Sequence, residues 1–331
     1  MKRGRFTLTL ALAVSLAFLL AGQAFANGQK EKSSSSTSST SGSKLMAIIV
    51  PSLSNPFFVA EEKFAKAEAE KLGYQTMVAS HNDDANTQQQ LIDTAIARHA
   101  SAIILDNAGA DVSIAPIKKA TDAGIPVFLI DREINAKGIA KAQIVSNNFQ
   151  GAQLEATQFA KLMNYKGTFV ELTGLPSDTN AHVREQGVGS ILSKFPDMKM
   201  VAIQTADWDQ TKAFNVTQTL LQAHPNIEGL VADNDTMAMG AEAALLAAHK
   251  PNVIVIGFDG SPDVVNSMKK GEIKADVLQP IAVFSTLAVE EANQYLTTGS
   301  TGKPEKQELN CILITPENMN QYQDWSMSSG S

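Results

Sequence analysis

Residues 45–58 read Leu-Met-Ala-Ile-Ile-Val-Pro-Ser-Leu-Ser-Asn-Pro-Phe-Phe. The first six residues form an unbroken apolar run, which is typical of a strand buried on both faces. Asn55 suits a helix N-cap, Pro56 suits the first helical turn, and apolar residues then recur at helical spacing until Gly73. The stretch predicts a strand, a turn and a helix that present an amide and two aromatic rings at a strand's carboxyl end, where ligands bind in open α/β sheets. Taken alone, it also fits an ordinary capped turn with core phenylalanines.

The chain beyond this stretch alternates apolar runs and helical patterns with short connections, which indicates parallel sheets covered by helices on both faces. Strands are expected at 45–50, 75–79, 102–106, 126–130 and 142–146, and in a second series at 167–173, 199–204, 228–232, 253–257 and 274–278. Helices are expected at 56–72, 86–99 and 113–123, then at 149–163, 182–194, 210–223, 235–248, 262–270 and 281–297, before a last run at 306–315.

Two such series predict two doubly wound parallel-sheet lobes of an α/β protein rather than one very wide sheet. The final helix has no strand partner in the second series, so the chain is expected to cross between the lobes three times and form a three-segment hinge. We expect residues 44–146 with 280–309 in the first lobe, and 147–279 with 310–331 in the second. The crossings are expected near Ser146–Asn147, Gln279–Pro280 and Leu309–Asn310.

The first 43 residues have the composition of a targeting segment and a tether. Basic residues precede an apolar run at 8–20, and Ala24-Phe-Ala26 fits a cleavage site, so residues 1–26 are predicted to be a signal peptide for export to the periplasm. A retained membrane anchor is the alternative. Residues 27–43 are rich in Ser and Thr and predict a disordered linker.

The composition favours a soluble globular protein. Of the 331 residues, 44% are hydrophobic and 18% are charged, and the net charge of -7 argues against nucleic acid or an acidic membrane as partner. The one cysteine, Cys311, lies in an apolar run and is expected to be a buried thiol. G-x-S-x-G, P-loop and G-x-G-x-x-G motifs are absent and the histidines lack metal spacing, so no catalytic residue, cofactor or metal is expected.

Polar residues follow the expected strands of both series, where the carboxyl ends of parallel strands meet. They are Asp106, Asp131 and Arg132 in the first series, and Arg184, Trp208, Asn234, Asp259 and Gln279 in the second. Carboxylates and amides that bind hydroxyl groups, together with aromatic rings that stack on C–H faces, suit a polyhydroxylated ligand. In isolation, Asp131-Arg132 also fits a surface ion pair, and Asp233 and Asp235 are expected to be helix caps, which leaves Asn234 for the site.

As a set, these residues resemble the ribose-binding proteins of the type I periplasmic sugar-binding family. The resemblance runs from about Lys44 to about Thr315 and rests on Ser-Asn-Pro-Phe-Phe at 54–58, Ile-Asp-Arg at 130–132, Ala-Asp-Trp-Asp at 206–209, Ala-His-Pro at 223–225, Asn-Asp-Thr-Met-Ala-Met-Gly at 234–240 and Val-Ile-Gly-Phe-Asp-Gly-Ser-Pro-Asp at 255–263. It implies that the sugar is hydrogen-bonded by Asn55, Asp131, Arg132, Arg184, Asn234, Asp259 and Gln279, and that it stacks on Phe57, Phe58 and Trp208.

The sequence departs from the ribose binders at three places. Asp106 stands in place of an Asn, Pro51 replaces a Ser, and the loop from Gly174 to Arg184 is longer. These departures argue against ribose itself and leave another aldopentose, a hexose or an acyclic polyol open as ligands. The extra acceptor Asp106 favours the polyol as the alternative to a ring sugar.

The resemblance implies a monomeric solute-binding protein that closes on a neutral sugar or polyol and delivers it to the membrane permease of an ABC importer. An exported carbohydrate-active enzyme is the alternative from another class. A third possibility is a sensor that presents the sugar to a chemoreceptor or a sensor kinase.

Overall fold

The computed structural model describes residues 44–327, which belong to one compact unit, residues 41–331. The predicted signal peptide and linker, and residues 328–331, lie outside the described residues. None of the helices in the described part of the chain is both long enough and apolar enough to span a membrane.

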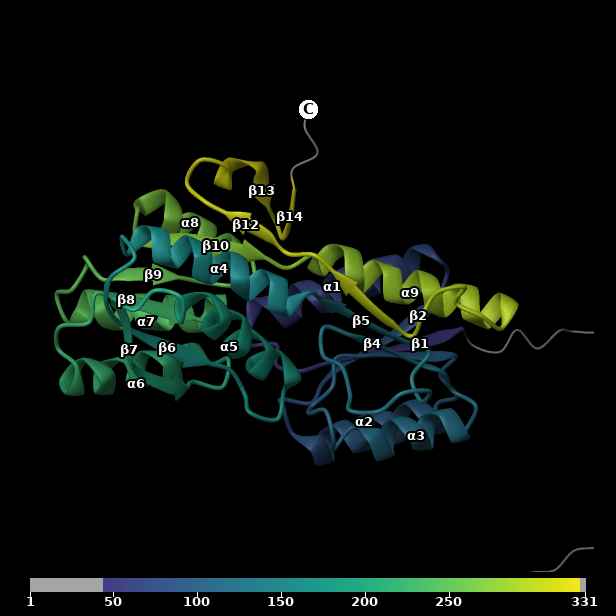
Figure 1. The fold of residues 1–331 in the computed structure, drawn as a ribbon. Helices are drawn as coiled ribbons and strands as arrows, with labels where there is room; N and C mark the ends of the chain where they lie inside the picture. Colours follow the sequence, from purple (N-terminus) through teal and green to yellow (C-terminus); the bar gives the residue numbers. More distant parts are fainter. Residues whose placement is uncertain (1–43, 328–331) are drawn as a thin grey trace, which may run out of the picture. The chain divides into compact units, whose positions relative to one another are not determined.

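The first lobe is a six-stranded sheet in which every pair of neighbouring strands is parallel. Across the sheet the strands are β11 (Lys306–Leu309), β5 (Ala142–Ser146), β4 (Val127–Ile130), β3 (Ala102–Leu105), β1 (Leu45–Val50) and β2 (Gln75–Ser80). Helices α1 (Pro56–Lys71) and α9 (Ile281–Thr298) cover one face, and α2 (Ala85–Ala97) and α3 (Ile114–Asp122) cover the other (Figure 1). All six residues of β1 are buried, as its apolar run predicts.

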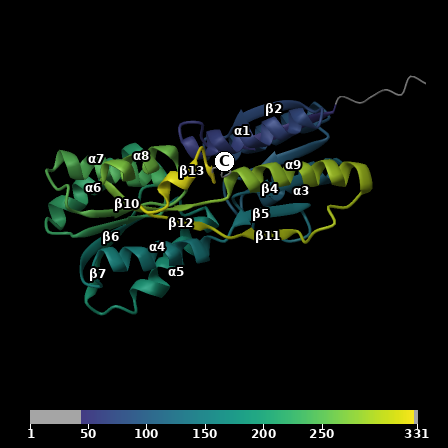
Figure 2. The ribbon, with the colours of Figure 1, turned by 90° about the horizontal axis from the view of Figure 1, so that it is seen from above.

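The second lobe is a six-stranded sheet in which only β12 runs antiparallel to its neighbour. Across the sheet the strands are β12 (Ile312–Ile314), β10 (Ile273–Leu278), β9 (Ile254–Ile256), β8 (Gly229–Ala232), β6 (Gly167–Thr173) and β7 (Met198–Thr205). Helices α4 (Asn148–Leu162) and α5 (Thr179–Leu192) cover one face, and α6 (Gln210–Ala223), α7 (Asp235–Ala247) and α8 (Pro262–Lys270) cover the other (Figure 2). The predicted fold class is confirmed.

The chain passes between the two sheets three times. It leaves the first sheet after β5 and returns to it after β10. The run expected at 306–315 divides at Asn310 and Cys311 into β11 in the first sheet and β12 in the second. The passages lie between β5 and α4, between β10 and α9, and between β11 and β12, and they place the carboxyl ends of both sets of parallel strands opposite one another.

The described chain ends in a short 3-10 helix, η1 (Met319–Gln321), and a hairpin of β13 (Tyr322–Gln323) and β14 (Ser326–Met327). Tyr322 packs into the core of the second lobe, whereas Trp325 packs into the core of the first. The expected lobe boundary groups all of residues 310–331 with the second lobe, so Trp325 lies across that boundary.

Candidate functional site

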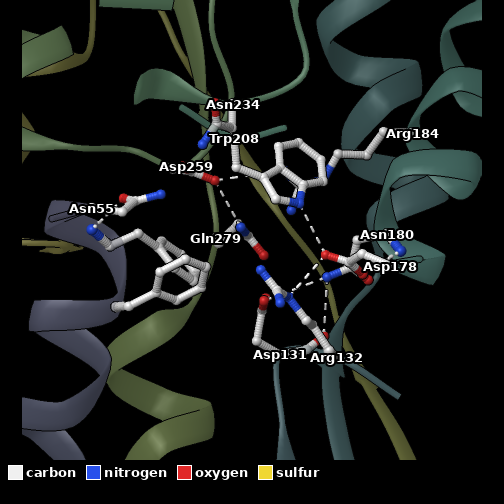
Figure 3. A pocket seen from close by; sticks show the side chains of 12 residues that line it. Asn55, Asp131, Arg132, Asp178, Asn180, Arg184, Trp208, Asn234, Asp259 and Gln279 are labelled. Atoms are coloured by element: carbon white, nitrogen blue, oxygen red, sulfur yellow. Dashed lines mark hydrogen bonds and ion pairs between the residues drawn. The ribbon is translucent and has the colours of Figure 1, made fainter. Parts of the chain in front are cut away.

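A small cavity of about 20 Å³ lies between the lobes at the carboxyl ends of the strands (Figure 3). This volume is far below the ~300–1,000 Å³ of pockets for drug-sized ligands, so the two lobes approach each other closely around the site. Its lining comes from both lobes: Asn55, Phe57, Phe58, Asp131, Arg132, Asp178, Asn180, Arg184, Trp208, Asn234, Asp259 and Gln279. Ten of the eleven site residues predicted from the sequence are in this set, and Asp106 is not.

The turn before α1 supplies one wall of the cavity. Asn55 is both the helix cap and a lining residue, since its Oδ1 accepts a hydrogen bond of 2.9 Å from the backbone N–H of Phe57. The cap uses the amide oxygen, so the Nδ2 donors remain for a ligand. Phe57 and Phe58 are buried and pack edge to face, with ring centroids 5.5 Å apart. The two interpretations of this turn, a cap with core rings and a ligand site, are therefore compatible.

Asp131 and Arg132 follow β4 and are not a surface ion pair, because Arg132 is 1% exposed and Asp131 is 3% exposed. The Arg132 guanidinium lies 5.1 Å from the centre of the Phe58 ring, and its Nη1 bonds to Asp83 Oδ1 at 2.7 Å. Burial by itself lowers the pKa of Arg132, but Asp178, Asp106 and Asp83 together raise that pKa well above its usual value. Arg132 is therefore a fixed cation in the first-lobe wall.

In the second lobe, Arg184 extends from α5 into the cavity and is held by several neighbours. Its Nε donates to Asn148 Oδ1 at 2.8 Å, and its Nη1 donates to the carbonyl oxygen of Asp233 at 2.6 Å. The guanidinium lies 3.9 Å from the centre of the Phe258 ring and 5.3 Å from that of Trp208. This packing fixes the plane of the guanidinium, and with it the direction of its donors.

The cap of α7 differs from the prediction. Asn234, not Asp233 or Asp235, is the N-cap, since its Oδ1 accepts a 2.9 Å hydrogen bond from Met237 N–H. Asp235 is the first residue of the helix, and its Oδ2 accepts from the backbone N–H of Ser261 at 2.6 Å. Asp233 is fully buried, and its carbonyl oxygen accepts the hydrogen bond from Arg184 Nη1. Asn234 therefore combines capping with cavity lining, as Asn55 does.

Two lining residues were missed in the sequence, and both join the lobes. Asp178 caps α5, and its Oδ2 lies 2.9 Å from Arg132 Nε and accepts a 3.1 Å hydrogen bond from Trp208 Nε1. Asn180 Nδ2 donates to the carbonyl oxygen of Asp131 at 3.2 Å. The sequence contained a signal for Asp178, because it occupies a helix-cap position after a strand, as Asn55 does.

Asp106 lies behind the cavity wall rather than in it. It is fully buried, and its Oδ1 is 3.5 Å from Arg132 Nε. Burial and the neighbouring Glu61 raise the pKa of Asp106 well above its usual value. Pro51, the other marked departure from ribose binders, is buried but is also absent from the lining. Asp106 is therefore not placed to offer a ligand in the cavity an extra acceptor.

Apart from Arg132 Nε, which is ion-paired with Asp178, three buried polar atoms of the lining have no hydrogen-bond partner among the described residues: Asp131 Oδ1, Arg132 Nη2 and Gln279 Oε1. The first two belong to the first lobe, and Gln279 follows β10 of the second, where its amide nitrogen donates to Asp259 Oδ1 at 2.8 Å. Buried polar atoms are normally paired, so these atoms are suited to the hydroxyl groups of a bound solute.

The ionisation of the lining follows from burial and from the two guanidinium groups. Burial, followed by the nearby Asp178, raises the pKa of Asp131 to about 6, with Arg184 and Arg132 acting in the opposite direction. Burial and Asp235 raise the pKa of Asp259 well above its usual value. The described residues contain no cluster of three or more His, Cys, Asp or Glu side chains that could hold a metal ion.

Two α/β lobes that enclose a small polar cavity with aromatic walls define a two-lobe solute-binding protein. A family model described as a periplasmic binding protein domain matches residues 46–301. The chain belongs to this family of solute-binding proteins, and its predicted resemblance to the ribose binders is confirmed.

Individual relatives agree with this assignment. A D-apiose import binding protein of Paraburkholderia graminis is 57% identical over 276 residues, which are 83% of this chain and 88% of that protein. The ribose import binding protein of Escherichia coli is 33% identical over 76% of this chain and 84% of that protein. A Bacillus halodurans solute-binding protein with bound myo-inositol is 26% identical with a TM-score of 0.80, covering 87% of this chain and 100% of that one. An Actinobacillus succinogenes protein with bound D-allose is 29% identical with a TM-score of 0.78, covering 84% and 99%.

Proposed function

We propose that this protein is the sugar-binding component of an ABC importer and that its ligand is D-apiose, a neutral pentose. The observation that carries the proposal is the set of buried polar atoms without a hydrogen-bond partner in one small cavity, with Asp131 Oδ1 and Arg132 Nη2 from the first lobe and Gln279 Oε1 from the end of β10 in the second. The choice among sugars is supported by two D-apiose import binding proteins, each 57% identical to this chain.

Binding is proposed to close the lobes by rotation about the three passages between the sheets. A ligand that contacts both walls binds the closed form more tightly than the open form and shifts the equilibrium between them. The pairs Arg132–Asp178 and Asp131–Asn180 join the two walls directly, so they add to the stability of the closed form. The first lobe proposed to move is residues 44–146 with 280–309. The second is residues 147–279 with the segment that begins at Asn310, although Trp325 of that segment packs into the first lobe.

The site of action is proposed to be the periplasm, reached through cleavage of residues 1–26, with residues 27–43 as a tether. The closed monomer is proposed to dock on a membrane permease. Presentation of the sugar to a chemoreceptor is compatible with the same closure. Loss of D-apiose uptake, rather than of chemotaxis, on deletion of the gene distinguishes transport from sensing.

The acyclic polyol becomes a weaker alternative, because its case depends on Asp106, which lies behind the wall. A thermal-shift and calorimetric panel of D-apiose, D-ribose, D-allose, myo-inositol and glycerol tests the ligand, since a solute that binds only the folded state raises Tm. D-Apiose is expected to give the lowest Kd. A lower Kd for another member of the panel would replace D-apiose as the ligand, and turnover of a sugar without saturable binding would contradict the transport role.

Arg184 provides a direct check on the site itself. Arg184→Ala removes a buried cation whose donors reach Asn148 and the Asp233 carbonyl, and it is expected to abolish the thermal shift with D-apiose. Because the change also opens space under Trp208, circular dichroism of the variant confirms that it is folded.

A further inference from the structure

The C-terminal hairpin, residues 322–327, bridges the two lobes. Tyr322 is buried in the core of the second lobe, with Met319 packed against the same cluster. Trp325, three positions further on, is buried in the core of the first lobe. In both ribbon views, β13 lies between α8 of the second lobe and α1 of the first (Figures 1 and 2). The hairpin is thus an additional, noncovalent connection between lobes that the three chain passages already join.

The hairpin turn holds Trp325 in a conformation that this side chain rarely adopts. Tyr322 pairs with Met327 and Gln323 with Ser326, which leaves Asp324 and Trp325 as a two-residue turn. Both turn residues have positive φ, 47° for Asp324 and 66° for Trp325. Turns of this kind strongly favour Gly at the second position, so a bulky aromatic residue there is strained. Such strain persists only where surrounding contacts outweigh it.

The contact that outweighs the strain is with an aromatic wall of the cavity. The Trp325 and Phe57 rings meet edge to face, with centroids 5.7 Å apart. Phe57 in turn packs on Phe58 and lies 6.4 Å from the centre of Phe284. Trp325 is not part of the cavity lining, so it supports Phe57 from outside the cavity, although the preceding Tyr322 is buried in the second lobe.

Trp325 also lies where the two lobes meet. A small hollow next to the cavity is lined by Trp325 together with Pro56 of the first lobe and Thr236 and Ser261 of the second. Tyr322 anchors the hairpin in the second lobe, so rotation of the lobes apart is expected to move α1, and Phe57 with it, relative to the hairpin. We therefore expect the Trp325–Phe57 contact to break when the lobes open.

We propose that Trp325 is a positioning residue for sugar binding: it holds Phe57 against the ligand and latches the lobes when they close. The proposal rests on the proposed function, since it assumes that closure accompanies binding of a sugar. Trp325 is expected to slow release of the ligand, because opening must break its contact with Phe57, and to leave the rate of association unchanged.

Substitution of Trp325 separates the aromatic contact from the strained turn. Trp325→Ala and Trp325→Gly both remove the ring and with it the contact with Phe57. Only glycine suits the positive φ at this position, so Trp325→Gly is expected to be the more stable of the two. Both are expected to bind D-apiose about tenfold more weakly through faster dissociation in stopped-flow measurements, as the loss of one aromatic pair implies. Trp325→Phe keeps a ring and is expected to stay within about twofold of the wild type.

A purely structural role for Trp325 predicts a different pattern. In that case Trp325→Ala lowers Tm while Trp325→Gly, with its relaxed turn, binds D-apiose with the wild-type dissociation rate, and this result would overturn the proposal. If Trp325→Ala does not fold, Trp325→Gly carries the test alone. Failure of the wild type to bind D-apiose contradicts the proposed ligand instead, and the variants are then compared with the panel sugar that the wild type does bind.

The chain has two tryptophans, so fluorescence gives a second test. In Trp208→Phe, Trp325 is the only remaining indole, and its quenching by acrylamide is expected to fall when D-apiose is saturating. Identical quenching with and without the sugar would show that the contact does not depend on closure, and the latch would be rejected.

Discussion

Replacing Gly174 with alanine is a direct test of the role of Trp208 in the cavity. A Cβ added at Gly174 would lie 1.8 Å from Cζ2 and 2.0 Å from Cε2 of Trp208, whereas real Cβ contacts are essentially never below 3.0 Å. Gly174 does not have a positive φ, so alanine itself fits the backbone. The indole must therefore leave its place while the rest of the lobe is unaltered.

The size of the effect follows from what the displaced indole loses. Its Nε1 donates to the buried Asp178 carboxylate at 3.1 Å. A hydrogen bond to a charged group contributes ~1.5–3 kcal/mol, which corresponds to an affinity about 10- to 100-fold lower if closure on the ligand requires the ring in place. Isothermal titration calorimetry with D-apiose measures this loss, and Tm reports whether the lobe remains folded.

Gly189→Ala is the matched control, since it lies in α5 of the same lobe and an added Cβ there meets nothing within 4 Å. It is expected to raise the free energy of unfolding by up to ~1 kcal/mol through helix propensity and to leave Kd unchanged. Wild-type affinity in Gly174→Ala would refute the assignment of Trp208 to the binding site.

Three further predictions concern charged groups. Asp178→Asn removes the charge facing Arg132 and is expected to weaken D-apiose binding about tenfold. It is also expected to increase the radius of gyration of the ligand-free protein in small-angle scattering, because the pair joins the two lobes. An unchanged scattering profile would contradict the bridging role. Burial raises the pKa of Asp233 from 3.8 to about 8, so between these two values the folded protein holds a proton that the unfolded chain releases, and stability falls as pH rises from about 4 to about 8 and then levels off. Asp233→Asn, which carries no titrating group, is therefore expected to raise Tm more at about pH 8.5 than at about pH 5, whereas the exposed Asp197→Asn should change Tm at neither pH. Asp131, with a pKa of about 6, accepts hydrogen bonds from hydroxyls best when ionised, so Kd for D-apiose is expected to be constant above about pH 7 and to rise below about pH 6; a flat profile would remove Asp131 from ligand contact.

The elements of the fold could be predicted because each one is encoded locally. The apolar run at Leu45–Val50 has only one favourable location, a strand buried on both faces, and Asn55 followed by Pro56 defines where the next helix begins. The alternation of these patterns then determines the topology, since parallel strands require helical crossovers. Most of the cavity lining follows from the same rule, because it lies at the carboxyl ends of the predicted strands.

The remaining features depend on how neighbouring residues turn and pack, which the sequence does not encode locally. Asp233, Asn234 and Asp235 are consecutive polar residues with similar capping preferences, and only the packed lobe determines that the central one caps the helix. Asp106 follows a strand as Asp131 does, but its side chain lies behind Arg132. Trp325 is far along the chain from Phe57, and a contact of such sequence separation has no local signal.

The distribution of charge explains why a neutral solute suits this cavity although two guanidinium groups line it. Arg132 is already compensated by Asp83 and Asp178, and Arg184 Nη1 lies 3.6 Å from Asp259 Oδ1. An anionic ligand would have to displace one of these aspartates from its arginine, or add its own charge to the lining. The lining already contains three aspartates, Asp131, Asp178 and Asp259. Hydroxyl groups carry no such penalty, because they can donate to Asp131 and accept from Arg132 without changing the net charge. The arginines therefore serve as oriented hydrogen-bond donors whose charge the protein itself neutralises, and selectivity among neutral sugars is left to the shape of the cavity and its aromatic walls.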